Sequence, residues 1–291
     1  MLLARSRSLE REKLEHLKSW DFELPCRVSG CHHFVSPRVI NGVAAPSIGA
    51  WVAESGPGLL ALRGAGTLTE SGTGDSPTVL HGPFTGHKGH LYQGAKYFQA
   101  DDTSTGDMGS GSVCISLHGL AISANTEVIF DKKGDINSLF PGITVLSQTS
   151  RVYVYVHGSG GGPGVGLFSG TLATDGTAYN VDIFIEPGQA NGRRIYVNGG
   201  LANADSLAAL STSLSNSRLL TIGAYDSGSL PFTGRLSAVG MWETSDTSWL
   251  ADDAAILDSA FRYHVNSCGF EPDHAEFPAP TIFTRTTTGT V

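Results

Sequence analysis

The sequence predicts an all-β fold, an antiparallel β-sandwich whose two sheets stack face to face. Of the 291 residues, 40% are hydrophobic, only 16% are charged and 37 are glycine, a composition typical of short strands joined by tight turns. From about residue 91, apolar runs alternate with glycine, asparagine and aspartate turn signals, as hairpins and Greek-key connections require. Ten such runs are candidate strands, at residues 91–99, 112–123, 126–133, 142–148, 151–158, 165–174, 178–187, 193–200, 218–225 and 234–243.

One predicted strand has two different faces. Side chains alternate between the two faces of a strand, so residues two apart share a face. Here valines alternate with aromatic residues, with Val152, Val154 and Val156 on one side and Tyr153, Tyr155 and His157 on the other. We expect the valines to face the core, and the tyrosine face either to bind a ligand or to pack against the other sheet.

The chain divides into four predicted parts. Residues 1–20 form a short N-terminal helix that anchors the chain, and residues 91–267 form the sandwich. Between them, residues 21–90 are an irregular β-rich segment, rich in proline, that either completes the sandwich or forms a separate anchoring subdomain. Residues 268–291, with three prolines and a threonine-rich end, form an extended C-terminal arm.

The sequence predicts two short helices. Leu14, Leu17 and Trp20 recur at a spacing of three, which indicates a helix over residues 7–20, and a second helix is predicted over residues 249–263. An isolated helix of this length is marginal in water. The N-terminal helix must therefore dock on its own domain or on a neighbouring subunit. The C-terminal arm is either a loose tail or a strand added to another chain's sheet.

Charge and the lack of apolar segments limit the partners. The formal net charge of −8 argues against nucleic acid or an anionic membrane, since both need a basic face. No secretion signal and no apolar run of about 20 residues is found, which predicts a soluble protein made in the cytoplasm without a membrane span. The four cysteines are few for the length and are expected to be thiols.

Two late stretches carry a resemblance to a known family. Residues 178–202 contain a core strand that turns through a polar, glycine-bearing loop into a strand ending in Tyr-Val-Asn-Gly. A closing pattern follows at Ile222, Gly223, Phe232, Gly234, Leu236, Val239 and Trp242. Both resemble the concanavalin A-like (laminin G-like) family, often found as modules of bacteriophage virion proteins and bacterial surface proteins. The resemblance covers residues 95–263, and it implies a fold more than a function.

The same fold houses glycan hydrolases, which carry carboxylates alternating along one strand so that acid and nucleophile face one cleft. Here Asp182 and Glu186 share a face, but Asn180 stands where the pattern requires a glutamate. The missing third carboxylate argues against hydrolysis. The nucleophile elbow, the zinc-protease helix and the dinucleotide fingerprint are absent too, so the sequence predicts no catalytic residues and no enzyme.

The sequence predicts no zinc site built from cysteine and histidine side chains. The first of two candidate clusters has its cysteines in a C-x4-C arrangement, which is not a usual zinc spacing, and the second has loop histidines without carboxylate or cysteine support. The clusters are Cys26, Cys31, His32 and His33, and His81, His87 and His90. Calcium through Asp101, Asp102, Asp107 and Asp226 is an open alternative, although solvated turn aspartates are the simpler interpretation. The glycine run at 158–164 lacks the lysine of a phosphate loop.

Two classes of function follow. The first is a virion structural protein of a tailed bacteriophage, as capsid decoration, neck, tail or fibre component. Its partners would be other virion proteins or copies of itself, held by the N-terminal helix and the C-terminal arm. The alternative is a lectin-like module for host-surface glycans, for which Tyr225 and Asp226 in a rim loop are suitable residue types. A glycan hydrolase comes last. The sequence assigns no binding residues.

Overall fold

The computed structural model describes the middle of the chain with several gaps. The described residues are 32–35, 39–40, 43–44, 60–63, 68–73, 78–81, 88–92, 95–100, 103, 107, 109, 112–134, 137, 140–158, 166–207, 213–236 and 238–244. All regular elements in these ranges are β-strands, and all their pairings are antiparallel. The described part contains no helix that could cross a membrane.

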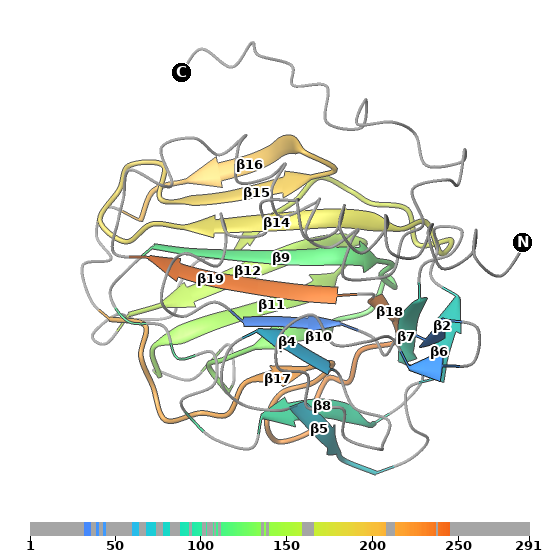
Figure 1. Cartoon of the computed structure of the whole chain (residues 1–291). Helices are drawn as coiled ribbons and strands as arrows, with labels where there is room; N and C mark the ends of the chain where they lie inside the picture. Colours follow the sequence, from blue (N-terminus) through green and yellow to red (C-terminus); the bar gives the residue numbers. More distant parts are fainter. Residues whose placement is uncertain are drawn as a thin grey trace, which may run out of the picture.

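Two seven-stranded sheets lie one behind the other (Figure 1). Sheet 1 has the order β16 (Gly200–Asp205), β15 (Arg193–Val197), β14 (Tyr179–Ile185), β9 (Ser112–Leu120), β19 (Ala238–Thr244), β1 (His32–Val35) and β4 (Leu60–Arg63). Sheet 2 has the order β13 (Leu167–Phe168), β12 (Arg151–His157), β11 (Gly142–Gln148), β10 (Glu127–Asp131), β17 (Thr221–Ile222), β8 (Tyr97–Ala100) and β5 (Leu68–Ser71).

Two smaller sheets accompany them. A three-stranded sheet contains β18 (Gly234–Leu236), β7 (Lys88–Tyr92) and β6 (Thr78–His81), and a two-stranded one contains β2 (Val39–Ile40) and β3 (Val43–Ala44). Strands from the N-terminal third also enter the main sheets: β1 pairs with β19, and β5 pairs with β8. The predicted helices at 7–20 and 249–263 and the arm at 268–291 lie outside the described residues.

The core lies between the two sheets and is built from alternate residues of each strand. Val113, Ile115 and Leu117 of β9 and the valines of β12 belong to one buried cluster. Each buried aliphatic side chain of this size contributes about 1.5–3 kcal/mol by leaving water. The two antiparallel sheets confirm the predicted all-β sandwich, and the valines of β12 face the core as expected.

The predicted strands match unevenly. The runs at 142–148 and 151–158 correspond to β11 and β12 almost residue for residue. The run at 165–174 contributes only the two residues of β13, and the run at 234–243 is divided between β18 and β19, which lie in different sheets. Strand β16 was not predicted because its sequence, GLANAD, has little apolar character; it is a half-exposed edge strand.

The glycines of the closing pattern are required by close contacts. Gly223 has a φ of +99°, and a Cβ there would lie 2.6 Å from the ring of Tyr92. Tyr92 packs edge-on against Phe98, with ring centroids 5.9 Å apart, and in a tilted arrangement against Phe232, with ring centroids 5.4 Å apart. The Phe232 amide donates to the Gly223 carbonyl oxygen at 2.7 Å. Gly223 therefore lets three buried aromatic rings meet, which explains why the pattern has glycine at this position.

We predict that Gly223→Ala lowers the free energy of unfolding by about 2–4 kcal/mol, because the new methyl group meets the Tyr92 ring in a backbone conformation that alanine disfavours. Gly170→Ala is the matched control, since a Cβ at Gly170 has nothing within 4 Å. Urea unfolding of both variants checks this. Equal stability of the two variants would contradict the assigned contact.

Two tight hairpins have the same backbone conformation but different sequences. Asn198 and Gly199 connect β15 to β16 with φ values of 49° and 77°, and Asn-Gly is the preferred pair for such a type I′ turn. Thr149 and Ser150 connect β11 to β12 with φ values of 50° and 59° and no glycine. Positive φ costs a non-glycine residue about 1–2 kcal/mol, so the β11–β12 turn is strained.

Ser150→Gly should therefore raise the free energy of unfolding by about 1 kcal/mol, since glycine adopts this conformation without steric cost. The backbone bonds of the turn, from Thr149 N to Ala124 O at 3.1 Å and from Leu172 N to Ser150 O at 2.8 Å, do not need the serine side chain. Exposed Ser217 lies outside the regular strands and has no positive φ, so Ser217→Gly should destabilise slightly. Thermal unfolding of both variants checks that the change in stability is positive for Ser150→Gly and negative for Ser217→Gly.

Candidate functional site

The outer side of sheet 2 carries a band of aromatic rings, which we call the aromatic face: Tyr153, Tyr155 and Phe168. Tyr153 and Tyr155 lie two residues apart on β12, with ring centroids 6.4 Å apart and planes 15° apart. Phe168 of β13 is the register partner of Tyr153, and their centroids are 5.3 Å apart. Phe168 is 38% exposed and both tyrosines are half-buried. The rings therefore form an accessible surface.

The aromatic face rests on a small apolar cluster of its own. Val128, Leu146 and Tyr225 are buried there, and the two tyrosines pack against them. The strand register places Val128, Leu146, Tyr153 and Phe168 in one row across β10, β11, β12 and β13. Because the row is fixed by backbone pairing, the rings are held in place before any ligand arrives.

Tyr155 has two further neighbours that set its ring and its hydroxyl. A Cβ at Gly166 would lie 2.7 Å from the Cζ atom of Tyr155, so glycine there leaves room for the ring. Burial raises the pKa of Tyr155 above its ordinary value, the neighbouring Tyr153 raises it further, and Arg193 opposes both. The hydroxyl is therefore neutral at physiological pH and can both donate and accept a hydrogen bond.

Arg151 lies at one end of the aromatic face. It begins β12, two residues before Tyr153, and its guanidinium carbon is 4.9 Å from the ring centroid of Phe168. A cation over an aromatic ring is attracted by the ring quadrupole. Neither Arg151 nor Phe168 was singled out from the sequence, although the alternation along 151–157 places Arg151 on the tyrosine side.

A rigid loop borders the aromatic face through Tyr225. The Tyr225 amide donates to the Ser229 carbonyl oxygen at 3.1 Å, and the Val128 amide donates to the Leu230 carbonyl oxygen at 2.9 Å, which joins the loop to β10. The Ser227 and Ser229 hydroxyls lie 2.9 Å apart. These bonds fix Tyr225 under the rings.

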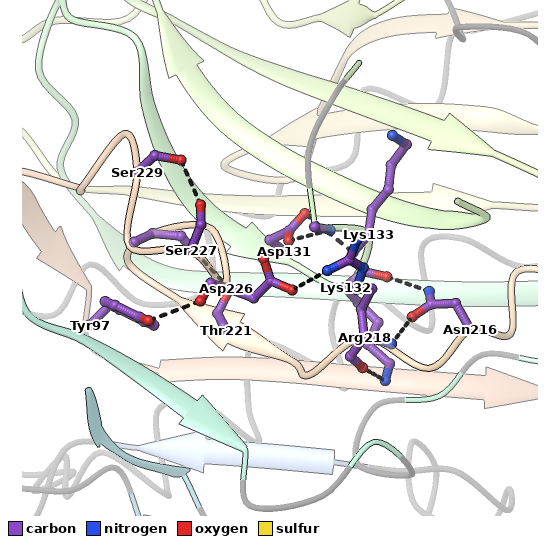
Figure 2. A network of polar contacts seen from close by, with 12 residues as sticks. Tyr97, Asp131, Lys132, Lys133, Asn216, Arg218, Thr221, Asp226, Ser227 and Ser229 are labelled. Atoms are coloured by element: carbon purple, nitrogen blue, oxygen red, sulfur yellow. Dashed lines mark hydrogen bonds and ion pairs between the residues drawn. The ribbon is translucent and has the colours of Figure 1, made fainter. Parts of the chain in front are cut away.

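Asp226 of the same loop is held from two sides, as Figure 2 shows. Its carboxylate pairs with Arg218 at 3.0 Å, and its carbonyl oxygen accepts a hydrogen bond from the Tyr97 hydroxyl at 3.1 Å. Arg218 also lies over the Phe140 ring, with its guanidinium carbon 4.3 Å from the centroid. Asp226 therefore fixes the loop and is not a bare carboxylate.

Asp131 is a buried carboxyl beside this loop. It accepts hydrogen bonds from the Thr144 hydroxyl at 2.5 Å, the Gly134 amide at 2.7 Å and the Lys133 amide at 3.3 Å. Burial raises the pKa of Asp131 to about 7, the charge of Asp226 adds to this, and the three donors oppose it. Thr144 is the register partner of Tyr155, so this polar cluster adjoins the aromatic face.

Lys132 joins three segments at the same end of the sheet. Its fully buried side chain donates from Nζ to the Thr103 carbonyl oxygen at 2.7 Å and to the Arg218 carbonyl oxygen at 2.5 Å. The Asn216 side-chain amide donates to the Lys132 carbonyl oxygen at 2.6 Å (Figure 2). Two polar side chains thus hold residues 216–218 against the turn after β10.

Two of the four aspartates considered as calcium ligands already have partners within the protein. Asp107 accepts hydrogen bonds from the Ser215 hydroxyl at 2.6 Å and the Asn216 amide at 3.0 Å, and Asp226 is paired with Arg218. Asp101 and Asp102 lie outside the described residues. Within the described ranges no three side chains of histidine, cysteine, aspartate or glutamate come together as metal ligands.

The two candidate carboxylates of β14 have different surroundings. Asp182 is 3% exposed and accepts a hydrogen bond from Ser116 of β9. Glu186, just beyond the strand, is paired with Arg194. Asn180 is buried as well, and no hydrogen-bond partner reaches its Oδ1 atom among the described residues. A glycosidase acid and its nucleophile need to meet substrate in a cleft. A buried carboxyl and an ion-paired one do not fit these roles.

The remaining predicted candidates are only partly described. His32 and His33 are in β1, His81 is in β6 and His90 is in β7. In the β6–β7 pairing His81 lies opposite Lys88, and His90 lies opposite Val79, so the two histidines are not register partners. Cys26, Cys31, His87 and most of the 158–164 turn lie outside the described residues.

Comparison with known proteins gives distant structural likeness alone. No protein-family model matches the sequence, and no curated protein is significantly similar to it. The binding domain of Paraclostridial Mosquitocidal Protein 1 has 9% identity and a TM-score of 0.46, covering 65% of this chain and 48% of its own. Domain 4 of AbnA, a GH43 extracellular arabinanase from Geobacillus stearothermophilus in complex with arabinotriose, has 14% identity and a TM-score of 0.41, covering 61% and 82%.

A third similar structure is the Botulinum neurotoxin serotype D binding domain, with 9% identity, a TM-score of 0.43, and coverage of 77% of this chain and 51% of that one. The chain thus spans about half the length of these two binding domains, those of Mosquitocidal Protein 1 and of the serotype D neurotoxin. All three TM-scores are below 0.5, so we transfer neither function nor site residues from these proteins.

The buried carboxyl of Asp182 predicts a pH-dependent stability. Burial raises the pKa of Asp182 to about 7 from an ordinary value of 3.8, against the opposing hydrogen bond from Ser116. The protonated form therefore stabilises the fold below pH 4, and this contribution is lost as pH rises towards 7. We expect the stability of the wild type relative to Asp182→Asn to fall by about 3 kcal/mol between pH 5 and pH 8.

Asp175→Asn is the control for this measurement. Hydrogen bonds from Thr177 lower the pKa of the exposed Asp175, so its charge does not change between pH 5 and pH 8. Urea unfolding at several pH values gives each difference. If the stability of the wild type relative to Asp182→Asn did not change with pH, the carboxyl would be ionised in the folded protein.

Proposed function

We propose that this chain is a glycan-binding β-sandwich module of the concanavalin A-like type and that the sugar binds on the aromatic face. The observation that carries the proposal is a row of accessible rings, Tyr153, Tyr155 and Phe168, on a buried apolar base. Phe168, which is 38% exposed, contacts Tyr153, so its exposed apolar surface is continuous with that of the tyrosines.

The chemistry of the face suits a sugar. The flat C–H faces of a pyranose pack on aromatic rings, while its hydroxyls need donors and acceptors nearby. Tyr153 and Tyr155 supply both a ring and a phenol oxygen, and each has only two rotatable torsions to order on binding. The rings are already positioned by Leu146 and Tyr225 beneath them, which lowers the entropic cost of binding.

The virion role stays a prediction beside this proposal. It depends on assembly through residues 1–20 and 268–291, which lie outside the described residues. A glycan-binding face is compatible with it, because a virion protein can attach to host surfaces. Hydrolysis is not part of the proposal, since Asp182 is buried and Glu186 is ion-paired.

Binding to a panel of immobilised oligosaccharides, followed by calorimetry on those retained, tests the proposal. Tyr153→Ala should weaken binding about tenfold or more, as expected for loss of one aromatic contact worth about 1–2 kcal/mol. Tyr196→Ala is the matched control, because Tyr196 is a half-buried tyrosine of β15 in the other sheet, packed on Phe184 at 5.6 Å. Near-UV circular dichroism verifies that both variants fold.

Two results would contradict the proposal. One is the absence of any retained oligosaccharide with the folded wild-type protein. The other is retention that Tyr196→Ala weakens and Tyr153→Ala leaves unchanged, which would place the site on sheet 1.

A further inference from the structure

Arg151 gives the aromatic face a charged end. It shares the outer side of β12 with Tyr153 and Tyr155, since all three are separated by two residues along the strand. Its register partner is Gln148, across the strained two-residue turn. The Phe168 ring contacts both side chains, with its centroid 4.9 Å from the Arg151 guanidinium carbon and 5.3 Å from the centroid of the Tyr153 ring.

Three other arginines of the described residues are each paired with a carboxylate, and Arg151 is not. Arg193 pairs with Asp205, Arg194 with Glu186 and Arg218 with Asp226. Across the described residues, Arg151 has no ion pair, and its side chain donates no hydrogen bond to the protein; its one side-chain interaction is with the Phe168 ring. Within these residues Arg151 therefore combines an unpaired charge with a place on the aromatic face.

Within the part of the chain that the structure describes, the N–H donors of Arg151 have no carboxylate partner. A guanidinium is planar and carries five N–H donors in that plane, while its faces stack on aromatic rings. The guanidinium carbon of Arg151 lies over the Phe168 ring, and no acceptor among the described residues takes a hydrogen bond from its N–H donors. Paired donors in this arrangement match the two oxygens of a carboxylate.

We infer that the aromatic face binds a carboxylate-bearing sugar, with one ring stacked on Tyr153 or Tyr155 and its carboxylate paired with Arg151. This inference rests on the proposed function and adds the class of sugar and the residue that selects it. The half-buried position of Arg151, away from bulk water on its Phe168 side, strengthens the ion pair relative to a fully exposed one.

The test compares pairs of oligosaccharides that differ only in charge. The probes are oligomers containing galacturonic, glucuronic or sialic acid, each with its counterpart in which the carboxyl group has been reduced to an alcohol. Affinities of the full chain are measured by calorimetry for wild type, Arg151→Gln, Arg151→Lys and Tyr153→Ala. Arg235→Gln is the matched control: Arg235 of β18 also lacks a carboxylate partner among the described residues, and it belongs to the three-stranded sheet.

We expect the wild type and Arg235→Gln to prefer at least one acid over its reduced counterpart by about tenfold or more. Arg151→Gln should abolish this preference while retaining the weaker binding of the reduced sugar. Arg151→Lys should recover part of the preference, because lysine keeps the charge and loses the paired donors. Tyr153→Ala should weaken both members of a pair.

The other outcomes separate the two proposals. Equal affinity for acid and reduced sugar, lost in Tyr153→Ala, would overturn the acidic class and leave the glycan-binding face intact. A preference for the acid that survives Arg151→Gln would overturn the role of Arg151. Failure of every acidic and neutral oligosaccharide to bind would overturn both the inference and the proposed function.

Discussion

The site depends on one constraint, the alternation of side chains along β12. Val152, Val154 and Val156 are buried between the sheets, and this burial places Tyr153 and Tyr155 on the outside. Exchanging the two faces would require the strand to slip by one residue, which would put tyrosines into a close-packed aliphatic core and valines into water. Pairing with β11 over seven residues opposes that slip. The free energy gained by burying the valines therefore also keeps the tyrosine rings on the outer side of sheet 2.

Polar contacts join the segments that meet at one end of sheet 2. Asp226 joins its loop to Arg218, and Lys132 ties the segment around Arg218 to the turn after β10. Buried polar groups are costly unless they are satisfied, so each such contact specifies a single arrangement of the loop. The arrangement places Tyr225 under the aromatic face, which links the closing part of the chain to the site.

The sequence was sufficient for the strands of the sandwich body and for the two faces of β12, because period-two burial is visible in the order of residues. It was insufficient for Arg151 and Phe168, since these two residues meet only because β12 pairs with β13, which lies further along the chain. The sequence also did not show which carboxylates form ion pairs with arginine. Asp226 and Glu186 resemble free ligands in the sequence, and their arginine partners are brought to them by the fold.

The central claim is that ligand contacts the outer side of β12. The most direct measurement is a nuclear magnetic resonance titration of the protein, labelled at tyrosine ring carbons, with an oligosaccharide that it retains. We expect the Tyr153 and Tyr155 ring resonances to shift in a saturable manner, while those of Tyr179 and Tyr196 in sheet 1 stay unchanged. Saturable shifts confined to Tyr179 and Tyr196 would contradict the central claim.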